Sequence, residues 1–222
     1  MSEPRALTTD EIKQIVADYA HAAKCSAEAG FDGVEIHGAN GYLIDQFLRD
    51  STNHRTDNYG GSIENRLRFA LEVVDSILSV LPAKKVGIRI APTSPANDIS
   101  DSNPRALFGA LAEELGKRKL VYVHVVEGAT QGDRDVAPFD WAGLKKTFGG
   151  VYIANNGYTR DMAIEAVSSG RADMVAFGRA FISNPDLVER LRKDAPLAEG
   201  DRATYYGGGA KGYTDYPTMD AA

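Results

Sequence analysis

Five short segments rich in β-branched and aromatic residues alternate along the chain with stretches of helical character. This alternation limits the fold more than any other feature. The segments span residues 33–37, 86–90, 121–126, 151–154 and 174–177. The helical stretches span residues 7–30, 62–80, 104–119, 141–148, 159–169 and 185–192. Because short apolar strands that alternate with helices are typical of a parallel sheet covered on both faces, the sequence predicts an α/β protein.

Several helix starts are marked by capping residues. Thr8 or Thr9 is placed to cap the first helix. The Asn-Pro pairs at residues 103–104 and 184–185 predict a cap followed by proline at the first helical position.

Polar residues or glycines follow each predicted strand. They are His37, Arg89, Glu127-Gly128, Asn155-Asn156-Gly157 and Gly178-Arg179. A TIM barrel keeps its functional residues at the carboxyl ends of many strands. A doubly wound sheet usually carries a G-x-G-x-x-G fingerprint, but the match at residues 207–212 follows no strand and precedes no helix, which predicts a turn in the tail. We therefore expect part of a (β/α)8 TIM barrel.

The number of predicted strands is smaller than a complete barrel requires. A barrel has eight strands and typically about 250 residues, whereas five strands are recognisable in these 222 residues. Five strands alone would leave two open sheet edges. We expect residues 1–222 to form the C-terminal part of a single barrel domain whose N-terminal strands are absent. Another chain, or self-association, would then cover the edges.

Charge and composition exclude several classes of function. The net charge of −6 argues against nucleic-acid binding. No apolar run approaches the length of a membrane span, and the charged N-terminus does not resemble a secretory signal, so a cytoplasmic location is expected. The single cysteine, Cys25, is expected to be a small core or semi-buried residue. We predict no metal site, because the histidines besides His37 show no ligand spacing.

The turn after the first strand carries the candidate catalytic residues His37, Asn40 and Tyr42. An imidazole and an amide can both donate to one substrate oxygen and so polarise it. A phenol can act as a proton donor. The alternative is that His37 is a core histidine with satisfied hydrogen bonds. Its strand-end position beside an amide and a phenol favours the catalytic interpretation.

The loops after the last two strands are candidates for phosphate binding. Barrels often bind phosphate at this position through backbone N–H groups. Gly157 and Gly178 would allow close approach of an anion, and Arg179 would add a forked cation. The alternative is a pair of ordinary turn glycines with a surface arginine.

Arg89 lies within an otherwise apolar strand and therefore needs a partner. Two interpretations remain open from the residues alone. Arg89 forms an ion pair with a core carboxylate such as Glu35, or it faces an electron-rich cofactor ring.

Four stretches of the chain together resemble the Old Yellow Enzyme family of FMN-dependent ene-reductases, with the bacterial nitrate-ester and enone reductases as the nearest type. The stretches are HGANGYLIDQFL from His37, RTDNYGGSIENR from Arg55, FGRAFISNPDL from Phe177, and the tail from Tyr206 to Pro217. The resemblance runs along nearly the whole chain. It implies a fold in which the matched region corresponds to strands four to eight of the barrel.

The resemblance also implies a role for each candidate residue. His37 and Asn40 would hold a carbonyl or nitro oxygen, and Tyr42 would protonate the α-carbon while FMN delivers hydride to the β-carbon. Tyr206 would line the substrate pocket. Arg89 would face the flavin pyrimidine edge. The FMN phosphate would be held by Asn156, Gly157, Gly178 and Arg179.

One departure from the family concerns the first three strands, which supply further flavin contacts and have no counterpart in this sequence. The first hypothesis is that the chain is one piece of a split reductase that works with a complementary N-terminal chain. It would reduce the activated C=C bonds of enones, enals and nitroalkenes. Nitrate esters would be a further class of substrate. The cofactor would be non-covalent FMN, and the reductant would be NAD(P)H. The second is that the chain is a non-catalytic remnant or assembly module that cannot hold flavin alone.

Overall fold

A single parallel sheet forms the centre of the computed structural model, which describes residues 4–130 and 132–219. Its strands follow one another in chain order, β1-β2-β3-β4-β5. They are β1 (Val34–Gly38), β2 (Val86–Ile90), β3 (Tyr122–Val126), β4 (Val151–Asn155) and β5 (Met174–Ala176). Each lies within a residue or two of its predicted segment. The sequential order of parallel neighbours confirms the predicted α/β fold, an open part of a (β/α)8 barrel.

Eight α-helices and three short 3₁₀ helices connect or flank the strands in the described part of the chain. The α-helices are α1 (Thr9–Glu28), α2 (Leu43–Leu48), α3 (Ile63–Leu78), α4 (Pro104–Lys117), α5 (Trp141–Phe148), α6 (Arg160–Ser168), α7 (Arg179–Ser183) and α8 (Leu187–Lys193). The 3₁₀ helices are η1 (Ala83–Lys85), η2 (Ala96–Asp98) and η3 (Arg202–Thr204). Sequence periodicity did not reveal α2 and α7, because each spans less than two turns.

The helix starts test the predicted caps. Thr8 caps α1 in a reciprocal capping box with Glu11. Asn103 caps α4, and proline occupies the first turn as predicted. The prediction for residues 184–185 was wrong, since α8 begins at Leu187. The Asn184 amide is buried and donates instead to the carbonyls of Ala180, at 2.9 Å, and Ala198, at 3.1 Å.

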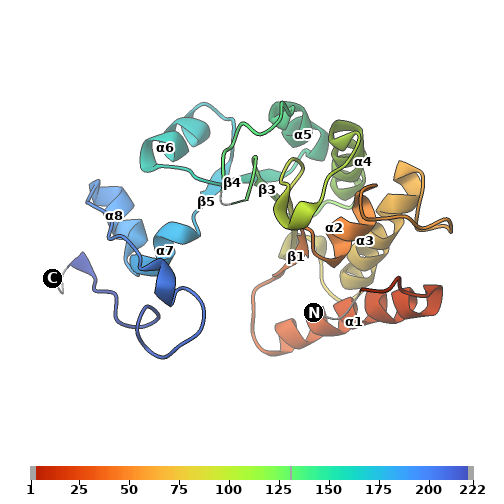
Figure 1. The fold of residues 1–222 in the computed structure, drawn as a ribbon, viewed down its shortest axis with the longest axis horizontal. Coiled ribbons are helices and arrows are strands. Elements are labelled where there is room, and N and C mark those ends of the chain that lie inside the picture. The colour runs from red at the N-terminus through yellow and green to blue at the C-terminus, as the bar shows by residue number, and fades with distance from the viewer. Residues whose placement is uncertain (1–3, 131, 220–222) are drawn as a thin grey trace.

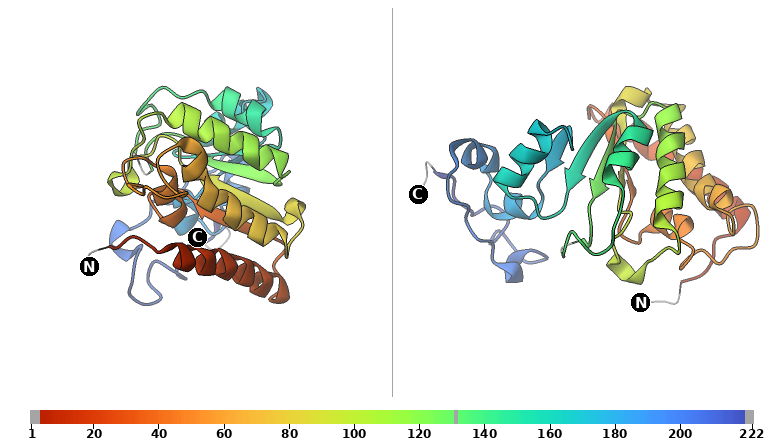
Figure 2. Two further views of the ribbon diagram at one scale, coloured as in Figure 1. Left: turned by 90° about the vertical axis from the view of Figure 1, so that its right-hand side faces the viewer. Right: turned by 90° about the horizontal axis from the view of Figure 1, so that it is seen from above.

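The sheet is curved, and α4, α5 and α6 lie on its convex side (Figure 1). Ile88, Val123 and Tyr152 point to this side and are buried in the core between sheet and helices. Viewed from above, the arc runs from the helices around β1 to the C-terminal tail (Figure 2). On the concave side, Met174 is 55% exposed. In the described residues β1 and β5 each pair with only one strand, so both edges are open.

Three further predictions concern single residues or absences. Cys25 is exposed, so the prediction of a core or semi-buried residue was wrong. It lies off the apolar stripe of α1, whose buried members are Ile12 and Ala23. Within residues 4–130 and 132–219, no helix has the length and apolarity required to cross a membrane. Within the same ranges, no group of three or more His, Cys, Asp or Glu side chains is placed to hold a metal ion.

Candidate active site

The turn after β1 brings two of the predicted catalytic side chains together. Asn40 and Gly41 both have positive φ, 59° and 74°, so the chain reverses sharply after the strand. A Cβ on Gly41 would lie 2.9 Å from the carbonyl oxygen of Ala96, which explains the need for glycine. As a result the His37 and Tyr42 rings lie 5.2 Å apart between centroids. Tyr42 is 59% exposed and is free to meet a ligand.

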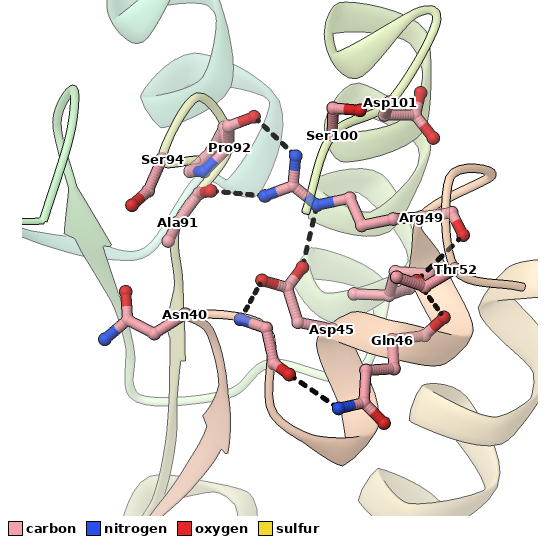
Figure 3. Close-up of polar contacts among 12 residues, drawn as sticks. Asn40, Asp45, Gln46, Arg49, Thr52, Ala91, Pro92, Ser94, Ser100 and Asp101 are labelled. Carbon is pink, nitrogen blue, oxygen red and sulfur yellow. Dashed lines mark hydrogen bonds and ion pairs between the residues drawn. The ribbon is translucent and has the colours of Figure 1, made fainter. Parts of the chain in front are cut away.

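A buried ion pair holds this turn in place (Figure 3). The Asp45 carboxylate accepts hydrogen bonds from Arg49 Nε at 2.8 Å and from the Gly41 backbone N–H at 3.0 Å. Arg49 also donates to the carbonyls of Ala91 and Pro92, just beyond β2. Burial raises the pKa of Asp45, and the charge and hydrogen bond of Arg49 oppose that rise. The pair therefore ties the turn to the end of the neighbouring strand.

The side chain of Asn40 is also held from outside the turn. Its Oδ1 accepts a hydrogen bond of 2.6 Å from the hydroxyl of Thr130, in the loop after β3. Its backbone carbonyl accepts one of 2.8 Å from Asn97 Nδ2, in η2. The Nδ2 group of Asn40 is thereby left as the available donor.

A row of polar side chains crosses the concave face at the level of His37. His37 is the register partner of Arg89, which is in turn the partner of His124. Arg89 Nη2 donates to Asn155 Oδ1 at 2.9 Å, and Glu35 instead contacts His124 Nδ1 at 2.9 Å. No ion pair joins Arg89 to Glu35 among the described residues.

The Nε atom of Arg89 is buried and has no hydrogen-bond partner within the part of the chain that the structure describes. A buried donor without a partner costs free energy. An electron-rich ring with acceptor atoms at this position would satisfy it, so the residues present fit a flavin. This observation favours the second of the two interpretations of Arg89.

The electrostatics of the row favour the neutral form of His37. Burial lowers the pKa of His37, and the positive charge of Arg89 lowers it further. Burial also lowers the pKa of Arg89, while Glu35 opposes the shift. Neutral imidazole retains one N–H donor, which is sufficient to bind a substrate oxygen.

The two loops predicted to bind phosphate lie side by side, because β4 and β5 are paired at Asn155 and Ala176. Gly157 has a φ of 64°, and a Cβ on Gly178 would meet no atom within 4 Å. Arg179, the first residue of α7, is exposed and forms no ion pair with a described residue. Open space beside two glycines and an uncommitted guanidinium fit an anionic group.

The side chain of Asn156 is engaged by the loop after β3. Its Nδ2 donates to the carbonyls of Glu127, at 2.7 Å, and Ala129, at 2.9 Å. The side chain therefore shapes the loop after β3, and only the backbone of Asn156 is left to face an anion.

Glu127 lies at a strand end but does not face the site. Its buried carboxylate accepts hydrogen bonds from Tyr152 at 2.9 Å, Tyr158 at 2.7 Å and Arg134 at 2.7 Å. The carboxylate raises the pKa values of both tyrosines, an effect second to that of burial. These contacts fix the ends of β3 and β4 on the helix side of the sheet.

Tyr206 is not brought to the catalytic turn. It is 84% exposed in the C-terminal tail, and no described hydrogen bond or ring contact joins it to His37 or Tyr42. The nearby Gly207 and Gly212 both have a φ of 80°; Gly212 lies in a turn, as predicted for the tail, and Gly207 lies in a bend.

Sequence reasoning missed Asp45, Arg49 and Thr130. The i,i+4 spacing of Asp45 and Arg49 is a signal for an ion pair on a helix. Thr130 carried no such signal, because it lies 90 residues from Asn40 in the chain.

Comparison with known proteins identifies relatives of the chain. The model of the NADH:flavin oxidoreductase / NADH oxidase family matches residues 1–198. The putative 12-oxophytodienoate reductase 6 of Oryza sativa subsp. japonica is 49% identical, over 99% of this chain and 57% of that relative. The 12-oxophytodienoate reductase 2 of Arabidopsis thaliana is 45% identical, over 98% and 59%. A structure of morphinone reductase in complex with tetrahydroNAD is 47% identical with a TM-score of 0.93, over 99% and 59%.

The chain thus spans between 57% and 60% of the length of the curated relatives it matches. Both the sequence and the fold agree along almost the whole of this chain. The chain therefore belongs to the NADH:flavin oxidoreductase / NADH oxidase family, the family of Old Yellow Enzyme, as its sequence motifs predicted.

Proposed function

We propose that this chain takes part in the reduction of activated C=C bonds of enones, enals and nitroalkenes, with FMN as cofactor and NAD(P)H as reductant. Nitrate esters are a further candidate substrate. The observation that carries the proposal is the turn after β1, where the His37 and Tyr42 rings lie 5.2 Å apart between centroids and His37 is the register partner of Arg89. The named activities of the matched 12-oxophytodienoate and morphinone reductases support this class of reaction, and the tetrahydroNAD complex of the latter supports an NADH-type reductant.

The substrate residues divide the work between binding and proton transfer. The His37 imidazole and the Asn40 Nδ2 group donate to the carbonyl or nitro oxygen, which draws electron density from the C=C bond. The chemistry that bound FMN supplies is hydride delivery to the β-carbon, and NAD(P)H reloads it. The Tyr42 hydroxyl gives its proton to the α-carbon and recovers one from solvent, which its exposure allows.

The cofactor would be held at both its polar ends. Arg89 offers its unsatisfied Nε–H to the polar edge of the ring system. The backbone around Asn156 and Gly157, together with Gly178 and Arg179, would hold the phosphate. Tyr206 would line the pocket only after the tail moved closer to the catalytic turn.

Additional strands would complete the barrel. β1 and β5 have open edges in the described residues, and the matched relatives are longer than this chain. Unpaired strand edges favour pairing with further strands. We therefore propose that a complementary N-terminal chain, or self-association, covers these edges and completes the flavin site.

The two half-reactions test the role of Tyr42. Tyr42→Phe is expected to slow enone reduction by about 10²- to 10⁴-fold, the usual contribution of a general acid. Reduction of the flavin by NAD(P)H, measured by stopped-flow absorbance, is expected to keep its rate because it needs no proton from Tyr42. Equal loss of both half-reactions would refute the proton-donor role.

A further inference from the structure

A chain of hydroxyl groups leads from the loop after β2 to the amide of Asn40. Ser94 Oγ lies 2.8 Å from Thr130 Oγ1, which lies 2.6 Å from Asn40 Oδ1. Ser94 is buried and Thr130 is partly buried. The three residues come from three different strand-end loops, so they meet only in the folded chain. Figure 3 shows Ser94 and Asn40 on the same side of the Asp45–Arg49 pair.

The backbone determines the direction of every proton in this chain. Ser94 Oγ accepts hydrogen bonds from the backbone N–H groups of Thr130, at 3.0 Å, and Ala96, at 3.4 Å. With both acceptor positions of Ser94 occupied, its own proton must go to Thr130 Oγ1. The Thr130 proton is then directed to Asn40, which must present its carbonyl oxygen to the hydroxyl. The amide NH₂ therefore points the other way.

We propose that Thr130, oriented by Ser94, is a positioning residue that locks the Asn40 amide as a hydrogen-bond donor toward the substrate. This inference rests on the proposed function and deepens it. A locked donor selects ligands that offer an acceptor oxygen, such as a ketone, an aldehyde or a nitro group. The reversed amide would present Oδ1 and repel such an oxygen. An alcohol, which can donate as well as accept, is insensitive to the orientation of the amide.

The orientation can be tested in the full chain without flavin. The side-chain NH₂ of Asn40 is observed by ¹⁵N NMR and identified by its disappearance in Asn40→Asp. Thr130→Val is expected to raise the population of the reversed amide about fivefold, the equivalent of one lost hydrogen bond, seen as new nuclear Overhauser effects between the Asn40 NH₂ protons and the side chain of residue 130. Thr130→Ser keeps the hydroxyl and is expected to behave as wild type. An unchanged population of the reversed amide in Thr130→Val would overturn the proposal.

Ligand selection is tested with the FMN-loaded protein, using the completing segment where loading requires it. The dissociation constants of cyclohexanone and cyclohexanol are measured by flavin absorbance. Thr130→Val is expected to weaken the ketone about five- to tenfold, through loss of one hydrogen bond and its preorganisation, and to leave the alcohol and FMN nearly unchanged. Equal weakening of both ligands would indicate general damage and overturn the proposal.

A double-mutant cycle tests the direction of the proton chain. Ser94→Ala frees Thr130 to accept instead of donate, so a loss of ketone affinity of about twofold is expected, below the value of a whole hydrogen bond. Because Ser94 acts only through Thr130, the double variant should bind the ketone no more weakly than Thr130→Val. Additive losses would overturn the role of Ser94. If the wild-type protein binds neither ligand, the proposed function fails, and the ligand selectivity proposed here fails with it. The NMR result is independent of ligand binding and therefore shows separately whether the Asn40 amide is locked.

Discussion

The buried Asp45–Arg49 pair gives the sharpest quantitative prediction. Asp45 is 0% exposed and Arg49 is 1% exposed. Asp45→Asn keeps the shape of the side chain but leaves a buried guanidinium without its counter-charge. We expect the free energy of unfolding to fall by about 3–5 kcal/mol, the usual cost of breaking a buried ion pair from one side. Arg49→Met leaves the opposite charge buried, together with the unsatisfied carbonyls of Ala91 and Pro92, and is expected to cost a similar amount.

The double variant separates charge from packing. With both charges removed, only hydrogen bonds of about 1 kcal/mol each are lost, so the double variant should cost less than the sum of the single variants by at least about 2 kcal/mol. Urea unfolding followed by circular dichroism measures the three values. Simple additivity of the two single variants would refute the view that the two charges compensate each other.

The pH dependence of the stability of Arg49→Met tests the direction of the Asp45 pKa shift. Burial raises the pKa of Asp45 above its unfolded value, so the associated stability is full at low pH and is lost as pH rises through the folded pKa. Arg49→Met removes a group that lowers this pKa and so raises it further. The loss in free energy of unfolding caused by Arg49→Met should therefore be smaller near pH 4 than near pH 7. The difference between the two pH values should be about 1.4 kcal/mol for each unit by which the pKa of Asp45 rises. A larger deficit at low pH would contradict the assignment.

Two further predictions concern the remaining site residues. His37 should titrate by NMR below its usual value of about 6.5, because of burial and the charge of Arg89. The unfolded state then binds a proton that the folded state does not, so His37→Gln should reduce the loss of stability as pH falls below about 6.5; titration of His37 at or above that value would contradict this. Arg179→Gln should weaken FMN binding about 10- to 100-fold, the value of a charge-assisted hydrogen bond. Arg192→Gln, an exposed arginine on α8, serves as the matched control, and equal effects of the two variants would remove the phosphate role of Arg179.

Local sequence patterns were sufficient to predict the strands and the longer helices. Buried residues such as Ile88 and Val123 form short apolar runs that need no tertiary information to be recognised. The failures arose where tertiary contacts decide. Asn184 resembles a helix cap, but the carbonyl of Ala198 competes for its side chain. Cysteine is a residue type that is often buried, but Cys25 lies on the side of α1 that faces solvent.

Sequence reasoning could group only those candidate residues that lie close together along the chain. His37 and Tyr42 are near neighbours in sequence, so one turn is enough to bring their rings within 5.2 Å of each other between centroids. The partner of Arg89 was not predictable, because Asn155 is 66 residues away and two strands across the sheet. The hydrogen bonds from Asn156 Nδ2 to the loop after β3 were not predictable for the same reason, because the accepting carbonyls lie 27 and 29 residues earlier in the chain.

The most direct test of the central claim is flavin binding with and without the strands proposed to complete the barrel. The chain is titrated with FMN alone, and then together with the segment of a 12-oxophytodienoate reductase that precedes the matched region. We predict that the added segment confers tight FMN binding, seen as a perturbed visible flavin spectrum, and protects the backbone N–H groups of β1 and β5 from hydrogen exchange. Absence of flavin binding in both samples would contradict the reductase proposal and favour a non-catalytic assembly module.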